Sequence, residues 1–126
     1  MSINIPDNAP RRVLELDEYI RFVGFADKFG KKIVSEYRKG LDPLLTEDEL
    51  KLQATNLAQM INTIKGLTHK LGSPIYLSTL YEKVKWVAIL LDNTKEYDLL
   101  MVSFDIGSDY DSIILNKILP LVKKGW

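Results

Sequence analysis

Apolar positions along the chain follow two periods, one typical of strands and one typical of helices. Residues 20–26 alternate apolar and aromatic side chains around Gly24, and residues 32–37 form a second run of the same kind. The polar segment between the two runs ends in Gly30, which predicts a turn because glycine takes a positive φ without steric cost. The two runs therefore predict a β-hairpin, and Gly24 predicts a bulge or a close neighbour.

The longest helical pattern begins at Thr46 and ends before Gly72. Thr46 and Glu49 have the spacing of a capping box, which is typical of a helix start. The apolar stripe of this helix consists of residues three, four or seven positions apart: Leu50, Ala54, Leu57, Ile61, Ile64 and Leu71. Leu52, Met60 and Leu67 widen the stripe to an arc, so we expect the helix to be covered on more than one side.

Three further runs, residues 75–81, 84–91 and 99–106, have the composition of strands. The second and third runs are apolar at nearly every position, which is typical of central strands covered on both faces. The first run carries Tyr76 and Ser78, so we expect it to be more exposed. Because the turn after residue 81 is short, we expect neighbouring strands to be antiparallel.

A last helix is expected after Ser108, since Asp111 follows at the spacing of a helix start. Pro120 falls inside its apolar pattern and should kink or stop the helix near Leu119. The residues of its expected core face are Ile113, Ile114, Ile118, Leu121 and Val122.

The N-terminus is expected to start with a flexible tail over residues 1–9 and a short helix that reaches about residue 17. The complete order of elements is then α-β-β-α-β-β-β-α. This order predicts a single α/β (α+β) domain over residues 10–126, built on a five-stranded antiparallel sheet.

The 126 residues carry 17 basic and 17 acidic side chains, so the formal net charge is zero. Nucleic-acid binders usually have a basic excess, so this balance argues against nucleic acid as the main partner. The chain has no cysteine, which excludes thiol catalysis, cysteine-ligated zinc and disulfides. Neither a signal peptide nor an apolar run of the roughly 20 residues that span a bilayer is visible. We expect a cytoplasmic protein without membrane insertion.

Two groups of residues are candidates for a metal site, and each has a simpler interpretation. His69 is the single histidine, and a lone histidine near a helix end favours a surface role over metal ligation. Asp105, Asp109 and Asp111 surround a strand-to-helix junction, where oxygen ligands for calcium or magnesium would be possible. Their spacing matches no calcium-binding loop, so helix capping is the favoured interpretation. We expect no metal and no cofactor.

Catalytic chemistry has little support in the sequence. Residues 47–49 are acidic and are explained as first-turn acids of the long helix. Neither a phosphate-binding glycine loop nor a nucleophile elbow is present. Tyr76, Tyr81 and Trp86 lie on neighbouring expected strands, and we interpret them as core or interface residues, with a ligand cavity as the alternative. We therefore expect no catalytic residues and no enzymatic activity.

The element order, the turn over residues 27–30 (Asp-Lys-Phe-Gly) and the long middle helix resemble the roadblock/longin domain, a profilin-like α/β sandwich. The resemblance covers most of residues 10–124. Four segments also resemble a family of small uncharacterised archaeal proteins, which implies the same fold and a cytoplasmic location but no activity. These segments are residues 20–24, 40–45, 71–72 and 81–84.

The roadblock resemblance implies dimerisation through strands and middle helices, and a role as a platform for small GTPases or larger scaffolds. We expect a homodimer, with a monomer whose two helices cover one face of the sheet as the alternative. The run of residues 75–81 would be an edge strand, and a bare apolar edge is an aggregation hazard. The candidate interface residues are Met60, Ile64, Leu67, Ile75, Leu77 and Tyr81.

Three functions remain open at the level of the sequence. The favoured one is a non-catalytic homodimeric protein-interaction or scaffold module of roadblock type, with a regulatory role and a small GTPase or another protein as partner. The alternative is a PAS-like or GAF-like sensor domain that holds a small molecule in an apolar cavity. The third is an enzyme, which would need a cleft with convergent carboxylates of strongly shifted pKa.

Overall fold

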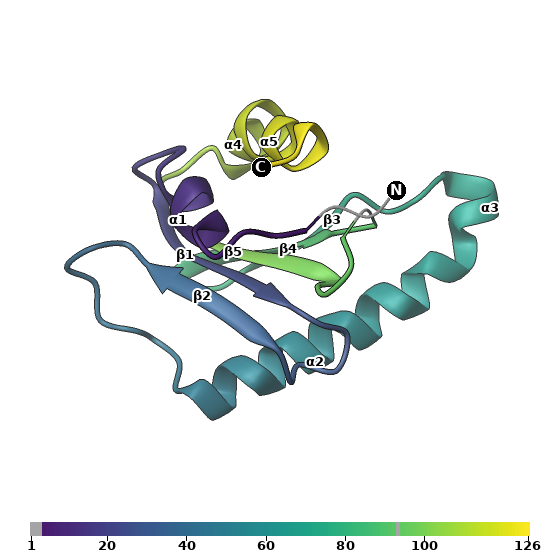
Figure 1. Ribbon diagram of the computed structural model, residues 1–126, viewed down its shortest axis with the longest axis horizontal. Coiled ribbons are helices and arrows are strands. Elements are labelled where there is room, and N and C mark those ends of the chain that lie inside the picture. Colours follow the sequence, from purple (N-terminus) through teal and green to yellow (C-terminus); the bar gives the residue numbers. More distant parts are fainter. Residues whose placement is uncertain (1–3, 93) are drawn as a thin grey trace.

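Over residues 4–92 and 94–126, which the computed structural model describes, five strands form one antiparallel sheet in the order β2-β1-β5-β4-β3 (Figure 1). β5, the last strand in the sequence, lies at the centre and joins the two hairpins, so β2 and β3 are the edges. The strands are β1 (Ile20–Ala26), β2 (Ile33–Tyr37), β3 (Tyr76–Leu80), β4 (Val84–Leu90) and β5 (Leu99–Asp105). The predicted five-stranded antiparallel α/β architecture is confirmed.

Helices cover both faces of the sheet (Figure 1). One face carries α2 (Glu47–Ile64), which continues through the 3-10 turn η1 (Lys65–Leu67) into α3 (Thr68–Leu71). The other face carries α1 (Ala9–Leu14) and the C-terminal helix. That helix consists of α4 (Tyr110–Ile113), the π-helical segment η2 (Ile114–Ile118) and α5 (Leu119–Lys124).

The alternation of side chains along the strands divides the core into two layers. The layer under α2 contains Phe22, Trp86, Ala88 and Met101 from the sheet, and the opposite layer contains Val23, Phe25, Val87 and Val102 among others. β4 and β5 contribute to both layers, which explains why their sequences are apolar at nearly every position.

α2 is held by the features that the sequence predicts. The Thr46 hydroxyl accepts from the Glu49 N–H at 3.1 Å, and the Glu49 carboxylate accepts from the Thr46 N–H at 2.9 Å, so the capping box is confirmed. The buried positions of α2 are Leu50, Ala54, Leu57 and Ile61.

Gly24 of β1 has the close neighbour that the sequence allowed for, because a Cβ at this position would lie 2.8 Å from the ring of Phe22.

The C-terminal helix differs from its prediction in two ways. Its N-cap is Asp109, whose carboxylate accepts from the Ser112 N–H at 3.4 Å, whereas the buried Ser108 hydroxyl has no partner within the described part of the chain. Pro120 does not stop the helix, which continues to Lys124. The π-helical segment just before it accommodates the proline, because its wider turn relieves the clash of the ring with the carbonyl four residues earlier.

The expected N-terminal tail over residues 1–9 is only partly covered, since residues 1–3 lie outside the described residues. Among the residues that follow, Ile5 packs against the core. α1 begins at Ala9, whose side chain is fully buried.

Candidate interaction surface

β3 is an edge strand, and within residues 4–92 and 94–126 no second strand pairs with its outer side. It is bonded to β4 on one side, where the Tyr81 N–H donates to the Val84 carbonyl and the Ile75 carbonyl accepts from the Leu90 N–H. Hydrogen-bonding direction alternates along an antiparallel strand. The N–H and C=O groups of Tyr76, Ser78 and Leu80 therefore point away from the sheet and are available to another strand.

The side chains along β3 are unusually exposed for their apolar character. Leu80 is 72% exposed, and Ile75 and Tyr81 at the two ends of the strand are each about half exposed. Natural proteins seldom leave such an edge bare, because it templates pairing with other chains. The exposed edge thus has the properties of an interface.

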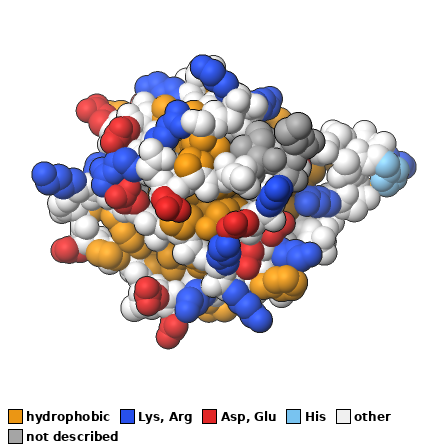
Figure 2. Space-filling view, viewed as in Figure 1, with side chains coloured by type: hydrophobic (Ala, Val, Ile, Leu, Met, Phe, Trp, Pro, Cys, Tyr) orange, Lys and Arg blue, Asp and Glu red, His pale blue; other side chains and the backbone are white. Residues whose placement is uncertain are grey.

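A second apolar surface follows the helix beside this edge. The helical segment over residues 47–71 is about 37 Å long, whereas the seven-residue central strands are about 24 Å long. The end of the helix therefore projects past the sheet, as a lobe in Figure 2. We call its apolar side the helix flank, and it consists of Met60, Ile64, Leu67 and Leu71, all of them exposed.

An open groove separates the first half of α2 from the turn after β3. Its volume is about 710 Å³, and its apolar walls come from Leu44, Leu52, Tyr81 and Trp86. Gln53 approaches the Tyr81 hydroxyl at 3.4 Å across the groove. The groove is lined by Tyr81 at the end of β3 and by Asn56 of α2, which lies one helical turn before Met60 of the helix flank, so the three surfaces adjoin.

A much smaller cavity lies beneath the loop over residues 41–45. Its volume of about 20 Å³ is enough for a single water molecule, whereas ligand pockets usually exceed about 300 Å³. Trp86 lines both this cavity and the groove, and its buried indole N–H has no acceptor among the described residues. This cavity therefore does not have the size that a sensor domain needs.

The structure brings most of the predicted interface residues to one side. Met60, Ile64 and Leu67 share the helix flank, and Ile75 and Tyr81 lie at the ends of the β3 edge. Leu77 differs from them, because it is half-buried and packs against the core layer under α2. Whether this side forms an interface stays a prediction.

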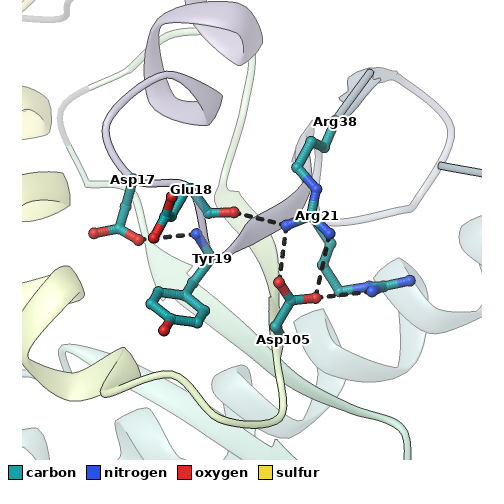
Figure 3. Close-up of polar contacts among 6 residues, drawn as sticks. All are labelled: Asp17, Glu18, Tyr19, Arg21, Arg38 and Asp105. Atoms are coloured by element: carbon teal, nitrogen blue, oxygen red, sulfur yellow. Dashed lines mark hydrogen bonds and ion pairs between the residues drawn. The ribbon is translucent and has the colours of Figure 1, made fainter. Parts of the chain in front are cut away.

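The three aspartates of the strand-to-helix junction do not converge on one point. Asp105 accepts from Arg21 at 2.8 Å and from Arg38 at 2.9 Å, and Arg38 also donates to the Glu18 carbonyl at 2.6 Å (Figure 3). Hydrogen bonding from Arg38, followed by that from Arg21, holds the pKa of Asp105 below its ordinary value of 3.8. Its role is to tie the ends of β1, β2 and β5 together.

The other two aspartates have separate partners. Asp109 caps α4, and Asp111 accepts a hydrogen bond from the Tyr76 hydroxyl. This bond raises the pKa of Tyr76 to about 12 and attaches β3 to the C-terminal helix. His69 is exposed in α3. Among residues 4–92 and 94–126, no group of three or more metal-ligating side chains comes together.

Several residues of this side were not singled out by the sequence. Leu52 and Leu71 were assigned to the helix pattern, and Leu44 and Leu80 received no role, although all four are exposed here. The aromatic candidates separate, because Tyr81 and Trp86 line the groove while Tyr76 lies on the opposite face. Leu52 could have been recognised from its position, because it is an apolar residue on the otherwise polar side of the helix.

Charge does not distinguish a binding face in the view of Figure 2. Lys and Arg side chains are interspersed with Asp and Glu side chains, and apolar side chains are exposed between them. The described helices include none that is both long and apolar enough to cross a bilayer.

The arrangement of strands and helices matches several solved structures. An MglB structure with a tetrameric arrangement gives a TM-score of 0.64 at 16% identity, covering 84% of this chain and 74% of that one. MglB of Myxococcus xanthus gives 0.63 at 17% identity, with 90% and 85% covered. A roadblock/LC7 domain of Streptomyces avermitilis gives 0.63 at 12% identity, with 94% and 92% covered.

The chain has the roadblock/longin-like fold. These identities establish the fold alone. No protein-family model and no curated protein matches the chain, so the resemblance to a small archaeal family stays a prediction.

Proposed function

We propose that this roadblock-fold protein is a cytoplasmic, non-catalytic homodimeric module that binds other proteins. The observation that carries the proposal is the continuous apolar side formed by the β3 edge and the helix flank. Exposed apolar patches of this kind, framed by polar residues, mark interaction sites in proteins that otherwise bury such side chains. A second copy of the chain supplies the same strand edge and the same helix, so the surface is complementary to itself.

The similar structures support self-association. One of them is an MglB structure with a tetrameric arrangement, and by analogy it supports an assembly of several copies of this chain. The three aspartates of the strand-to-helix junction have separate partners: Asp105 pairs with arginines, Asp111 accepts from Tyr76, and Asp109 caps α4. A binding role needs none of these groups to be reactive.

A small GTPase is the partner class that we propose for the dimer, following the resemblance to roadblock domains. Such a partner binds differently in its GTP and GDP states, which gives the proposal a specific signature. A role in regulation would follow from that dependence on the nucleotide.

Two measurements test the two halves of the proposal. Light scattering at tens of micromolar should give the mass of two chains, and a strictly monomeric protein would overturn the homodimer. Affinity capture from native cells, performed once with a non-hydrolysable GTP analogue and once with GDP, should recover a GTP-binding protein preferentially in one state. Recovery of the same proteins in both states would contradict the GTPase partner and leave the homodimer intact.

A further inference from the structure

The second edge of the sheet is β2, which lies opposite β3 and is not part of the surface proposed for the homodimer (Figure 1). An inference about this edge therefore goes beyond the proposed function. β2 pairs with β1 only, and a hydrogen bond marks each end of this ladder. The Asp27 N–H donates to the Lys32 carbonyl at 3.1 Å, and the Arg38 N–H donates to the Arg21 carbonyl at 2.8 Å.

These two bonds determine which backbone groups of β2 face outward. Hydrogen-bonded and non-hydrogen-bonded pairs alternate along an antiparallel ladder. Val34 and Glu36 therefore bond to β1, whereas the N–H and C=O groups of Ile33, Ser35 and Tyr37 point away from the sheet. Within residues 4–92 and 94–126, no other strand or loop bonds to these outward groups. The edge is therefore open to a further strand along the whole of β2.

A groove follows this edge, between β2 and the first turns of α2. Its volume is about 430 Å³, which is within the range of ligand sites. Its walls include the side chains of Ile33, Ser35 and Tyr37, the same residues whose backbone groups face outward. Val34 and Glu36 point to the other face, where Val34 packs against the core layer under α1 and Glu36 forms an ion pair with that helix. An added strand would therefore direct every second side chain into the groove.

The end of the groove beside Tyr37 is apolar. Pro43 and Leu45, from the loop before α2, line it together with the ring of Tyr37. This ring is held against Phe22, with ring centroids 4.7 Å apart. An apolar side chain of an added strand would be buried against these residues.

The end of the groove beside Ile33 is basic, because Lys31 and Lys51 both line the groove. α2 brings Lys51 to this end, since a Cβ on Gly30 would lie 2.8 Å from the Lys51 carbonyl. Glu47 is one helical turn before Lys51, but neither lysine forms an ion pair with any residue that the structure describes. This end of the groove therefore suits a negatively charged side chain.

The positions of the two ends give the added strand a sequence pattern. Antiparallel pairing is slightly more stable than parallel pairing, so the added residue opposite Tyr37 comes first and the residue opposite Ile33 follows four positions later. We propose that the β2 edge binds an extended segment of a partner protein, with an apolar residue beside Tyr37 and an acidic residue four positions later beside Lys31 and Lys51. Backbone hydrogen bonds to β2 provide affinity in this mode of binding, and the alternate side chains provide specificity.

The probe is a set of short synthetic peptides, chosen by selection from a displayed random library on the unmodified chain. We expect the selected sequences to share an apolar residue followed four positions later by Asp or Glu. Ser35→Pro should weaken binding of such a peptide at least about fivefold, because it removes the central outward N–H. Proline is tolerated there, since β1 does not use that N–H. Ser35→Ala keeps the N–H and is the matched control, and calorimetry measures both affinities.

A methylated peptide tests the same hydrogen bonds without altering the protein. N-methylation of the peptide residue opposite Ser35 should abolish binding, whereas N-methylation of the next residue, whose N–H points away from β2, should not. Charge is tested by Lys51→Glu, which should turn the selection from acidic toward basic residues at that position. Lys70→Glu, at an exposed position of α3, is the control with the same net charge.

Each remaining outcome overturns the inference or separates it from the proposed function. Selection of no peptide, or equal effects of the two methylated peptides, would overturn the added strand. A selection without acidic residues, or one unchanged by Lys51→Glu, would overturn the acidic partner. A mass above that of two chains, reduced by Ser35→Pro, would place a second copy on this edge in its stead. A monomer that binds the peptide as described would overturn the homodimer and leave this inference intact.

Discussion

The indole of Trp86 stacks on the ring of Phe22, with ring centroids 5.5 Å apart and ring planes at 21°. The two residues lie on β4 and β1 and are separated by β5, where Ser103 is opposite both of them. The stack therefore crosses over a strand, and it exists because Ser103 leaves room above the backbone. The two stacked rings line the small cavity beneath the loop over residues 41–45.

Ser103→Leu should destabilise the protein by about 1–3 kcal/mol, because a large side chain would force Phe22 and Trp86 apart in a packed layer. Ser103 is only 4% exposed, so the added side chain cannot turn to solvent. Urea unfolding followed by Trp fluorescence measures the change. Ser103→Ala is the matched control and should stay within about 1 kcal/mol of the unmodified protein, since it preserves the space. Equal losses in both variants would contradict the packing argument.

Gly30 connects the turn between β1 and β2 to α2. Its φ is +69°, and an added Cβ would lie 2.3 Å from the Thr55 hydroxyl and 2.8 Å from the backbone carbonyl of Lys51. Gly30→Ala should therefore cost more than the roughly 1 kcal/mol expected from positive φ alone. Gly40→Ala is the control, because Gly40 has a φ of +86° and open space around its Cβ position. The difference in unfolding free energy between the two variants isolates the contact, and equal values would disprove it.

Asp105 should make the stability of the protein depend on pH in the acid range. Its folded pKa lies below the ordinary value of 3.8 because Arg38 and Arg21 donate to the carboxylate. The stabilisation is therefore fully present above about pH 4 and is lost as the pH falls through the folded pKa. With the carboxylate partly exposed, Asp105→Asn should cost about 1 kcal/mol at pH 7.

The measurement is chemical unfolding between pH 2 and pH 7. The difference between Asp105→Asn and the unmodified protein should shrink toward low pH, where the carboxyl is protonated in both its folded and unfolded forms. Asp92→Asn, at an exposed position of the loop after β4, is the matched control for the loss of a surface carboxylate. A constant difference across the whole range would contradict the role assigned to the two arginines.

The helices and strands of this fold are predictable from local patterns, whereas the pairing of strands with one another is not. The capping box at Thr46 and Glu49 and the helix stripe are encoded within a few residues, so the sequence predicts α2 closely. The central place of β5 depends on pairing with β1, about 80 residues earlier in the chain, and no local pattern contains it. The partners of Asp105 are equally distant, so the local pattern indicated helix capping and did not contain this ion pair.

The candidate surface shows the same division. The apolar arc of the helix, which Leu52, Met60 and Leu67 widen, predicted a cover on a second side, and these three residues are indeed exposed. The groove was not predictable, because it is formed by a loop, a helix and a strand turn that meet only in three dimensions. Pro120 misled the prediction of the last helix, since a π-helical turn is not encoded by a recognised residue pattern.

A charged residue introduced on the helix flank should weaken association of two chains while leaving the stability of the single chain nearly unchanged. Leu67 is 54% exposed in the single chain and lies in a turn that contains no buried residue, so Leu67→Glu should change the unfolding free energy by only about 0.5 kcal/mol or less. The proposed homodimer covers the helix flank, where a desolvated carboxylate is unfavourable. We expect the dimer dissociation constant to rise at least about tenfold, which corresponds to about 1.4 kcal/mol.

Asn62→Glu, an exposed position on the opposite flank of the helix, is the matched control. Sedimentation velocity over a concentration series should show dissociation for Leu67→Glu alone, and an unchanged dissociation constant in that variant would remove the helix flank from the interface.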